Sequence, residues 1–195
     1  MKSIILLLAC VVGFASSALH AQFIPSAGVH GYLSERVTAS DLGGEASLEL
    51  TGRSGWHVGA DVRIGKKALY VQPGVHYYST NSRVTDLQAI GLPRDLGAQN
   101  HRALKVPLNV GLRIGLNGTA AVHFQGGPVA TASLQEKLVA DLGGQRDLTL
   151  GAQAGLAVDL LRFNVHARYE WGLTDAWEYT AGSADVLSVG VGVVF

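Results

Sequence analysis

The stretch GWHVGADVRIGKKALYVQPGVHYY, Gly55 to Tyr78, predicts a β-hairpin whose two faces differ in chemistry. Side chains alternate between the faces of a strand, so residues two apart share a face. In the first half, one face carries Trp56, Val58, Ala60, Val62 and Ile64, and the other carries His57, Gly59, Asp61, Arg63 and Gly65. The second half repeats this pattern, and Gly65 to Ala68 is short enough to be the turn. A soluble sandwich would bury the apolar face, whereas a membrane barrel would turn it towards lipid.

The same two-residue period recurs along the chain and predicts eight strands. They cover Ala27 to Leu33, Gly55 to Gly65, Leu69 to Tyr78, Leu104 to Ile114, Ala120 to Gly126, Leu148 to Val158, Leu161 to Leu173 and Leu187 to Phe195. The connections after the second, fourth and sixth strands are short (Gly65 to Ala68, Gly115 to Gly118 and Leu160-Leu161), and the other connections are long. Transmembrane barrels alternate short periplasmic turns with longer outer loops in this way. The sequence therefore predicts an all-β fold, an eight-stranded antiparallel up-and-down transmembrane β-barrel.

Charged residues of the strands share the inward face of this barrel. The predicted polar network of the lumen consists of Asp61, Arg63, Lys105, Arg113, Asp159, Arg162, Arg168 and Glu170. Eight strands leave an interior that is filled by side chains rather than a wide channel. A two-residue turn at Leu160-Leu161 would set Asp159 opposite Arg162, and Gln153 opposite Arg168. We therefore expect a lumen that paired charges fill and close to solutes.

Four histidines fall on the same inward face, His57, His76, His123 and His166. If Ile64 pairs with Leu69, His57 faces His76, but no nearby carboxylate completes a set of metal ligands. Hydrogen bonding inside the lumen is the favoured interpretation. No metal site, cofactor or catalytic residue is predicted.

Aromatic residues mark the predicted outer ends of the strands. Trp56 begins one strand, Tyr77 ends the next, and Tyr169 and Trp171 end another. Because Trp and Tyr are enriched where a membrane meets water, these four residues predict an aromatic girdle. The final strand ends on Phe195 in alternating register, which resembles the C-terminal signal read by the outer-membrane assembly machinery.

The N-terminal segment predicts export. Met1-Lys2 precedes an apolar run from Ile4 to Phe14, and small residues follow as far as Ala21. This pattern is typical of a secretory signal peptide, so we expect residues 1–21 to be removed and residues 22–195 to form the barrel domain. Cleavage after Ala18 is an alternative, and a lipobox ending at Cys10 is disfavoured because it would leave an apolar N-terminus.

Composition excludes several classes of protein. Without Cys10 the chain has no cysteine, so it has neither a disulfide framework nor a thiol nucleophile. Fifteen basic and fifteen acidic residues give a formal charge of zero, and nothing indicates a nucleic-acid partner. The sequence thus favours the outer membrane of a Gram-negative bacterium, with outer-membrane lipids and the assembly machinery as partners.

Three stretches resemble strands of a known family. They are LKVPLNVGLRIG (Leu104 to Gly115) with its internal proline, RFNVHARYEWGLTD (Arg162 to Asp175) with its Arg-Tyr-x-x-Gly-Leu motif, and LYVQPGVHYY (Leu69 to Tyr78). These motifs resemble the PorT-like outer-membrane β-barrel domain proteins of Gram-negative bacteria. The ending GVGVVF departs from that family, because it lacks the large aromatic residue or Arg often seen before the terminal Phe. The resemblance implies one eight-stranded barrel, similar in architecture to the small OmpX- and OmpA-like barrels, and no catalytic residues.

The favoured function is that of a non-enzymatic outer-membrane protein whose long surface loops serve the envelope, secretion or surface interaction. An outer-membrane lipid-modifying enzyme is the first alternative, with Ser79 and His76 as weakly supported candidates for its nucleophile and base. A secreted soluble barrel that binds a lipophile is the second, and it would place the apolar faces inside.

A short motif recurs in the predicted outer loops. Asp41 to Gly44 is repeated as Asp141 to Gly144, with Asp95 to Ala98 between them. Calcium-binding or ligand-binding loops are one interpretation, but Asp and Gly are also ordinary turn residues. Turns are therefore the favoured prediction for all three segments.

Overall fold

The structure, a computed structural model, describes residues 21–34, 36–39, 46–65, 68–86, 94–134, 148–174 and 185–195. Its strands are β1 (Ala21–Ser34), β2 (Arg36–Ala39), β3 (Ala46–Ile64), β4 (Leu69–Asp86), β5 (Arg94–Asn117), β6 (Ala120–Ser133), β7 (Leu148–Leu160), β8 (Phe163–Gly172) and β9 (Asp185–Val193). No helix among the described residues is long and apolar enough to cross a membrane. The predicted signal segment, including Cys10, lies outside the described residues apart from Ala21, where β1 begins.

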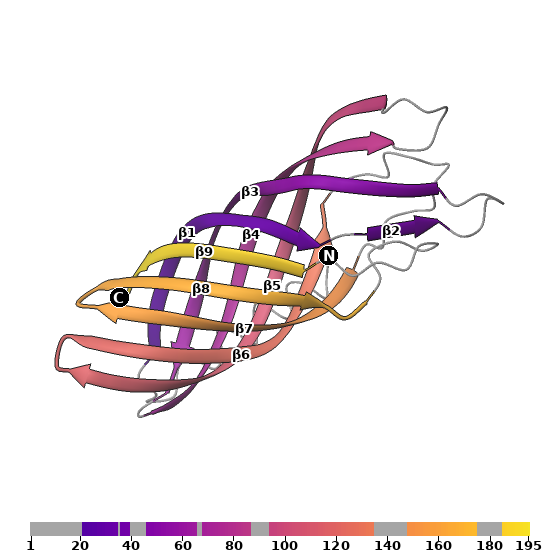
Figure 1. Cartoon of the computed structure of the whole chain (residues 1–195). Helices are drawn as coiled ribbons and strands as arrows, with labels where there is room; N and C mark the ends of the chain where they lie inside the picture. Colours follow the sequence, from indigo (N-terminus) through magenta and orange to yellow (C-terminus); the bar gives the residue numbers. More distant parts are fainter. Residues whose placement is uncertain are drawn as a thin grey trace.

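The described strands close into a barrel. Their order is β1-β9-β8-β7-β6-β5-β4-β3-β2, and β1 also pairs with β3. β1 pairs with residues 54–64 of β3, and β2 pairs with residues 46–49 of the same strand. β1 and β2 together therefore count as one of the eight strands of the barrel wall. Every described pairing is antiparallel. Figure 1 shows β6, β7, β8 and β9 side by side on one wall, with β4 and β5 crossing behind them. The predicted eight-stranded up-and-down barrel is confirmed.

Side chains sort by the two-residue period, with the apolar residues on the outside. Leu69 is 68% exposed whereas Tyr70, its neighbour on β4, is 4% exposed. The exposed side includes Val29, Val58, Val110, Phe124, Leu156 and Val191, and the buried side includes His57, Asp61, Asn109, His123 and Arg168. This arrangement is the reverse of a soluble barrel, whose core is apolar. The alternative of a soluble lipophile-binding barrel, which would place the apolar faces inside, is therefore wrong.

Glycine lets two neighbouring strands share the narrow interior. Gly111 of β5 is paired with Tyr70 of β4, and a Cβ built on Gly111 would overlap the Tyr70 ring. The ring therefore lies over the glycine and fills space in the lumen that a larger residue would occupy.

Five strands are several residues longer than the sequence predicted: β1 begins at Ala21 and β6 continues to Ser133, and β3, β4 and β5 have the longest additions. β3 begins at Ala46 rather than Gly55, β4 continues to Asp86, and β5 begins at Arg94. Figure 1 shows these outer parts projecting beyond the barrel wall. Alternation is needed only where one face meets lipid, so beyond that zone backbone pairing continues without a hydrophobic pattern to reveal it. The predicted turn at Asp95 to Ala98 is accordingly wrong, because this segment pairs with β4.

The last short turn lies one residue later than predicted. Leu161 and Arg162 form it, and the φ of Leu161 is 57°, in the left-handed region where residues other than Gly are uncommon. No Gly or Asn in the sequence marks this turn. Asp159 is consequently paired with Asn164, and Arg168 with Gly155, so the predicted pairs with Arg162 and Gln153 are wrong.

The outward face of β5 supplies a test of the side-chain assignment. Val110 is 58% exposed near the middle of the wall, whereas Ala157 is 3% exposed in the lumen beside His123 and His166. A charge on a lipid-facing residue near mid-membrane costs about 2–4 kcal/mol. Val110→Arg should therefore reduce folding into lipid vesicles, measured by the heat-modifiable gel shift, far more than Ala157→Ser. A larger loss from Ala157→Ser would reverse the inside and the outside of the barrel.

Candidate functional site

The described lumen is crossed by three ion pairs, each with a nitrogen–oxygen distance of 2.6 Å. They are Arg63 Nη1–Asp159 Oδ2, Arg168 Nη2–Asp61 Oδ2 and Lys105 Nζ–Glu170 Oε2. The pairs join β3 to β7, β3 to β8, and β5 to β8, none of which are neighbouring strands. Each pair therefore ties one side of the barrel to another through the interior.

The first pair lies near the short turns. Asp159 accepts a hydrogen bond from Asn164 Nδ2 at 2.6 Å, and His123 Nε2 lies 2.9 Å from its other oxygen, which also binds Arg63. Arg63 also donates to Gln72 and Gln22, at 3.2 Å each. A buried carboxylate is tolerated only when its charge and lone pairs have partners, and Asp159 has three.

The second pair lies deeper in the barrel and involves a histidine. Besides Arg168, Asp61 has His76 Nε2 at 3.0 Å from its other oxygen. A carboxylate therefore does lie beside one of the predicted histidines, although it completes no set of metal ligands among the described residues. The expected facing of His57 and His76 is also wrong, since Ile64 pairs with Val71 and this shifts the register by two residues.

The third pair lies towards the outer end, among aromatic rings. Lys105 Nζ binds Glu170 and also lies 4.7 Å from the centre of the Tyr78 ring, an attractive arrangement for a cation. Tyr78 stacks on His57, with ring centres 4.8 Å apart and planes at 13°. His30 adds a hydrogen bond of 2.9 Å to Thr80. These aromatic and imidazole rings fill the lumen on the outer side of the ion pairs.

Two residues predicted for the lumen network lie elsewhere. Arg113 and Arg162 are exposed at the end of the barrel that carries the short turns. Arg113 has the inward parity of its strand but lines the pocket at the open end, and Arg162 belongs to the turn itself. The other six predicted residues lie together in the three ion pairs.

The predicted network named charged residues, and of its uncharged members only Gln153 was given a partner, which was the wrong one. Gln153 Nε2 donates to Asn109 Oδ1 at 2.8 Å, and Gln22, Gln72 and Asn164 bind the charged residues. All lie on the inward face of their strands. Their inward position in the two-residue alternation identified them as lumen residues, but the predicted network contained only charged residues.

The described lumen contains neither a set of metal ligands nor the catalytic pair of the enzyme alternative. No described group of three or more His, Cys, Asp or Glu is arranged to hold a metal ion. Ser79 lies on the opposite face of β4 from His76 and donates to Asn100 Oδ1 at 3.4 Å. The faint nucleophile–base pair of the enzyme alternative is therefore not assembled.

The four girdle residues lie on the outward face as two contacting pairs. Trp56 and Tyr77 have ring centres 5.7 Å apart, and Tyr169 and Trp171 4.9 Å apart. Trp56 and Tyr77 do not end their strands, which run on into the projecting region. Their role at the membrane interface stays a prediction.

Phe195 is 69% exposed, and its backbone exchanges two hydrogen bonds with Phe23. The pairing extends the contact of the last residues with β1 beyond β9. Its role in assembly also stays a prediction.

Comparison with known proteins supports the fold. No family model and no curated protein sequence matches this chain. Among solved structures, the outer membrane protein OprG from Pseudomonas aeruginosa has a TM-score of 0.52 and 14% identity, over 91% of this chain and 97% of that one. The outer membrane protein AlkL, determined in lipid bilayers, has a TM-score of 0.51 and 12% identity, over 90% of each chain. The chain thus shares the fold of small outer-membrane barrels, while the narrower PorT-like resemblance is not confirmed.

The Asp61–Arg168 pair supplies a test of how the lumen is held together. Arg168→Met would leave a carboxylate that is 1% exposed without its cation, and breaking a buried pair in this way costs about 3–5 kcal/mol. The double variant Asp61→Leu/Arg168→Met removes the unpaired charge and should recover most of that loss. Urea unfolding in vesicles, followed by tryptophan fluorescence, measures both. Strictly additive losses would show that the two residues do not act as a pair.

Proposed function

We propose that this chain is an integral protein of the outer membrane of a Gram-negative bacterium, that it is not an enzyme, and that its lumen is closed to solutes. The proposal includes export through a cleaved signal peptide. One observation carries it: the barrel turns its apolar side chains outward and joins its charged side chains across the interior.

The outer face supports residence in a bilayer. Exposed Leu, Val and Phe side chains occur on every one of the long strands, β1 and β3 to β9. Such a belt in water would be far larger than the apolar patches of ordinary soluble proteins. Lipid is the environment in which it is stable, because a closed barrel leaves no unpaired strand edge to the hydrocarbon.

The interior supports a plug rather than a channel. Three acidic and three basic side chains within the described lumen are paired one to one. They leave no net charge there that would attract a flow of ions. Tyr70, Tyr78 and the histidine rings occupy the space between the pairs. A small eight-stranded barrel has room for side chains of this kind and little else.

The projecting strands support a role at the cell surface. Trp56 precedes the end of β3 by eight residues, close to the roughly 9–11 residues that a strand needs to cross a bilayer. The rest of β3 and the matching parts of β4 and β5 then extend beyond the membrane as a paired sheet. We infer that this extension and the loops around it carry the contacts that serve the envelope, secretion or surface interaction.

Single-channel recording tests the closed lumen. Purified protein in planar bilayers should show no sustained conductance. Asp61→Ala/Arg168→Ala shortens two side chains that meet in the middle of the interior, so it should admit ions while the heat-modifiable band persists. Val110→Ala on the outward face is the control and should stay silent. Stable, reproducible conductance from the unmodified protein would reject the plug and favour a pore.

A further inference from the structure

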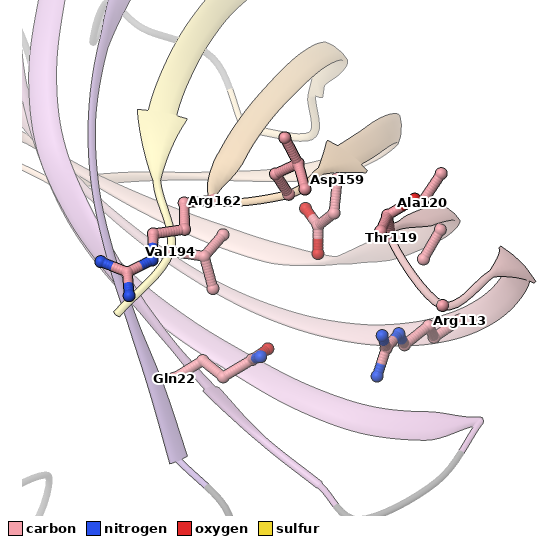
Figure 2. A pocket seen from close by; sticks show the side chains of 10 residues that line it. Gln22, Arg113, Thr119, Ala120, Asp159, Arg162 and Val194 are labelled. Atoms are coloured by element: carbon pink, nitrogen blue, oxygen red, sulfur yellow. The ribbon is translucent and has the colours of Figure 1, made fainter.

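The open end of the barrel next to the short turns contains a pocket of about 310 Å³. The residues that matter to its chemistry are Gln22, Arg113, Asp159, Leu161, Arg162 and Val194. They come from β1, β5, β7, the β7–β8 turn and the segment after β9, so only closure of the barrel brings them together. Figure 2 shows Arg113 and Gln22 extending towards each other across the opening, with Asp159 on a further side, and the guanidinium group of Arg162 turned away from them beside Val194.

The two arginines of this pocket differ from those of the lumen. Arg63 and Arg168 each bind a carboxylate at 2.6 Å, whereas the guanidinium groups of Arg113 and Arg162 bind no carboxylate of the described chain. Both are exposed. A guanidinium group presents several N–H donors in a plane and binds phosphate or carboxylate oxygens in pairs.

The carboxylate in the pocket does not cancel this charge. Asp159 is already neutralised by Arg63 and has further contacts with Asn164 and His123. Gln22 uses its Oε1 to accept from Arg63, so its amide nitrogen is the group left to donate towards the opening. The lining therefore has an excess of positive charge and of hydrogen-bond donors, which suits an anion.

The rim beside the arginines is apolar. Leu161 at the tip of the turn is 71% exposed, and Leu160 and Phe163 on either side of the turn are also exposed on the outward face. Leu161 adopts its left-handed φ of 57° although it is not glycine, a backbone conformation that persists only where the surroundings hold it. A cationic pocket directly beside a lipid-facing rim fits a ligand with a phosphate at one end and acyl chains at the other.

We propose that Arg113 and Gln22 bind the phosphate of an anionic phospholipid from the inner leaflet of the membrane. Arg162 adds positive charge at the edge of the pocket, and the acyl chains lie against the Leu160–Phe163 rim. The proposal rests on the proposed function, which sets the short turns on the periplasmic side. Basic pockets at a membrane surface bind lipid headgroups in this manner. A free phosphate has the same headgroup chemistry but gains nothing from the apolar rim.

Native mass spectrometry of the folded full chain in detergent tests the site. Titration with phosphatidylglycerol should show one lipid retained, and Arg113→Gln/Arg162→Gln should weaken its apparent affinity about tenfold, since one charge-assisted interaction and the positive charge beside it are lost. Arg102→Gln is the matched control, because Arg102 is an exposed arginine on β5 near the other end of the barrel. It should bind like the unmodified chain, and phosphatidylcholine should not distinguish the variants.

Equal phosphatidylglycerol binding by the unmodified chain and the double variant would overturn the site. An equal loss with Arg102→Gln would also overturn it, because the lipid would then respond to net charge alone. Displacement of the lipid by inorganic phosphate at a comparable concentration would reject the lipid in favour of a free phosphate. Failure of the unmodified chain to give a heat-modifiable band in vesicles would instead reject the proposed function, so the two proposals fail separately.

Discussion

Closure of the barrel through β1 is the constraint on which the rest of the structure depends. β1 pairs with β9 on one side and with β3 on the other, so no edge is left along the wall that they share. Once the wall is closed, every side chain points either to the outside or to a narrow interior. Polar groups in that interior have little water to bind and must find one another. The apolar belt and the polar lumen are two results of the same closure.

The three ion pairs follow from this confinement. Each carboxylate in the described lumen meets a cation that comes from a strand that is not its neighbour, at 2.6 Å. Contacts of this kind hold opposite walls at a fixed spacing, and the rings of Tyr70 and Tyr78 fill the remaining space. Confinement ends at the open mouth, where Arg113 and Arg162 are exposed. Whether an arginine is paired with a carboxylate therefore depends on how deep it lies in the lumen.

The likeness to OprG and AlkL concerns the wall and not the contents of the lumen. At 14% and 12% identity the shared feature is the barrel, and one barrel architecture carries many functions. What distinguishes this chain is the side chains that its wall turns inward and the long outer parts of β3, β4 and β5. Function has to be argued from those features.

The sequence by itself determined the number of strands in the barrel wall, which face of each strand points inward, and most of the residues that line the lumen. It could do so because side-chain alternation depends only on neighbouring residues. It did not reveal the outer extensions of β3, β4 and β5, where no lipid imposes a pattern. Only the tertiary structure decided which charges meet, since the partners are 65 to 107 residues apart and cross the lumen. The turn at Leu161 and Arg162 also shifted the register without any sequence mark. Pairing across a closed barrel depends on the register of the whole wall, which no local pattern encodes.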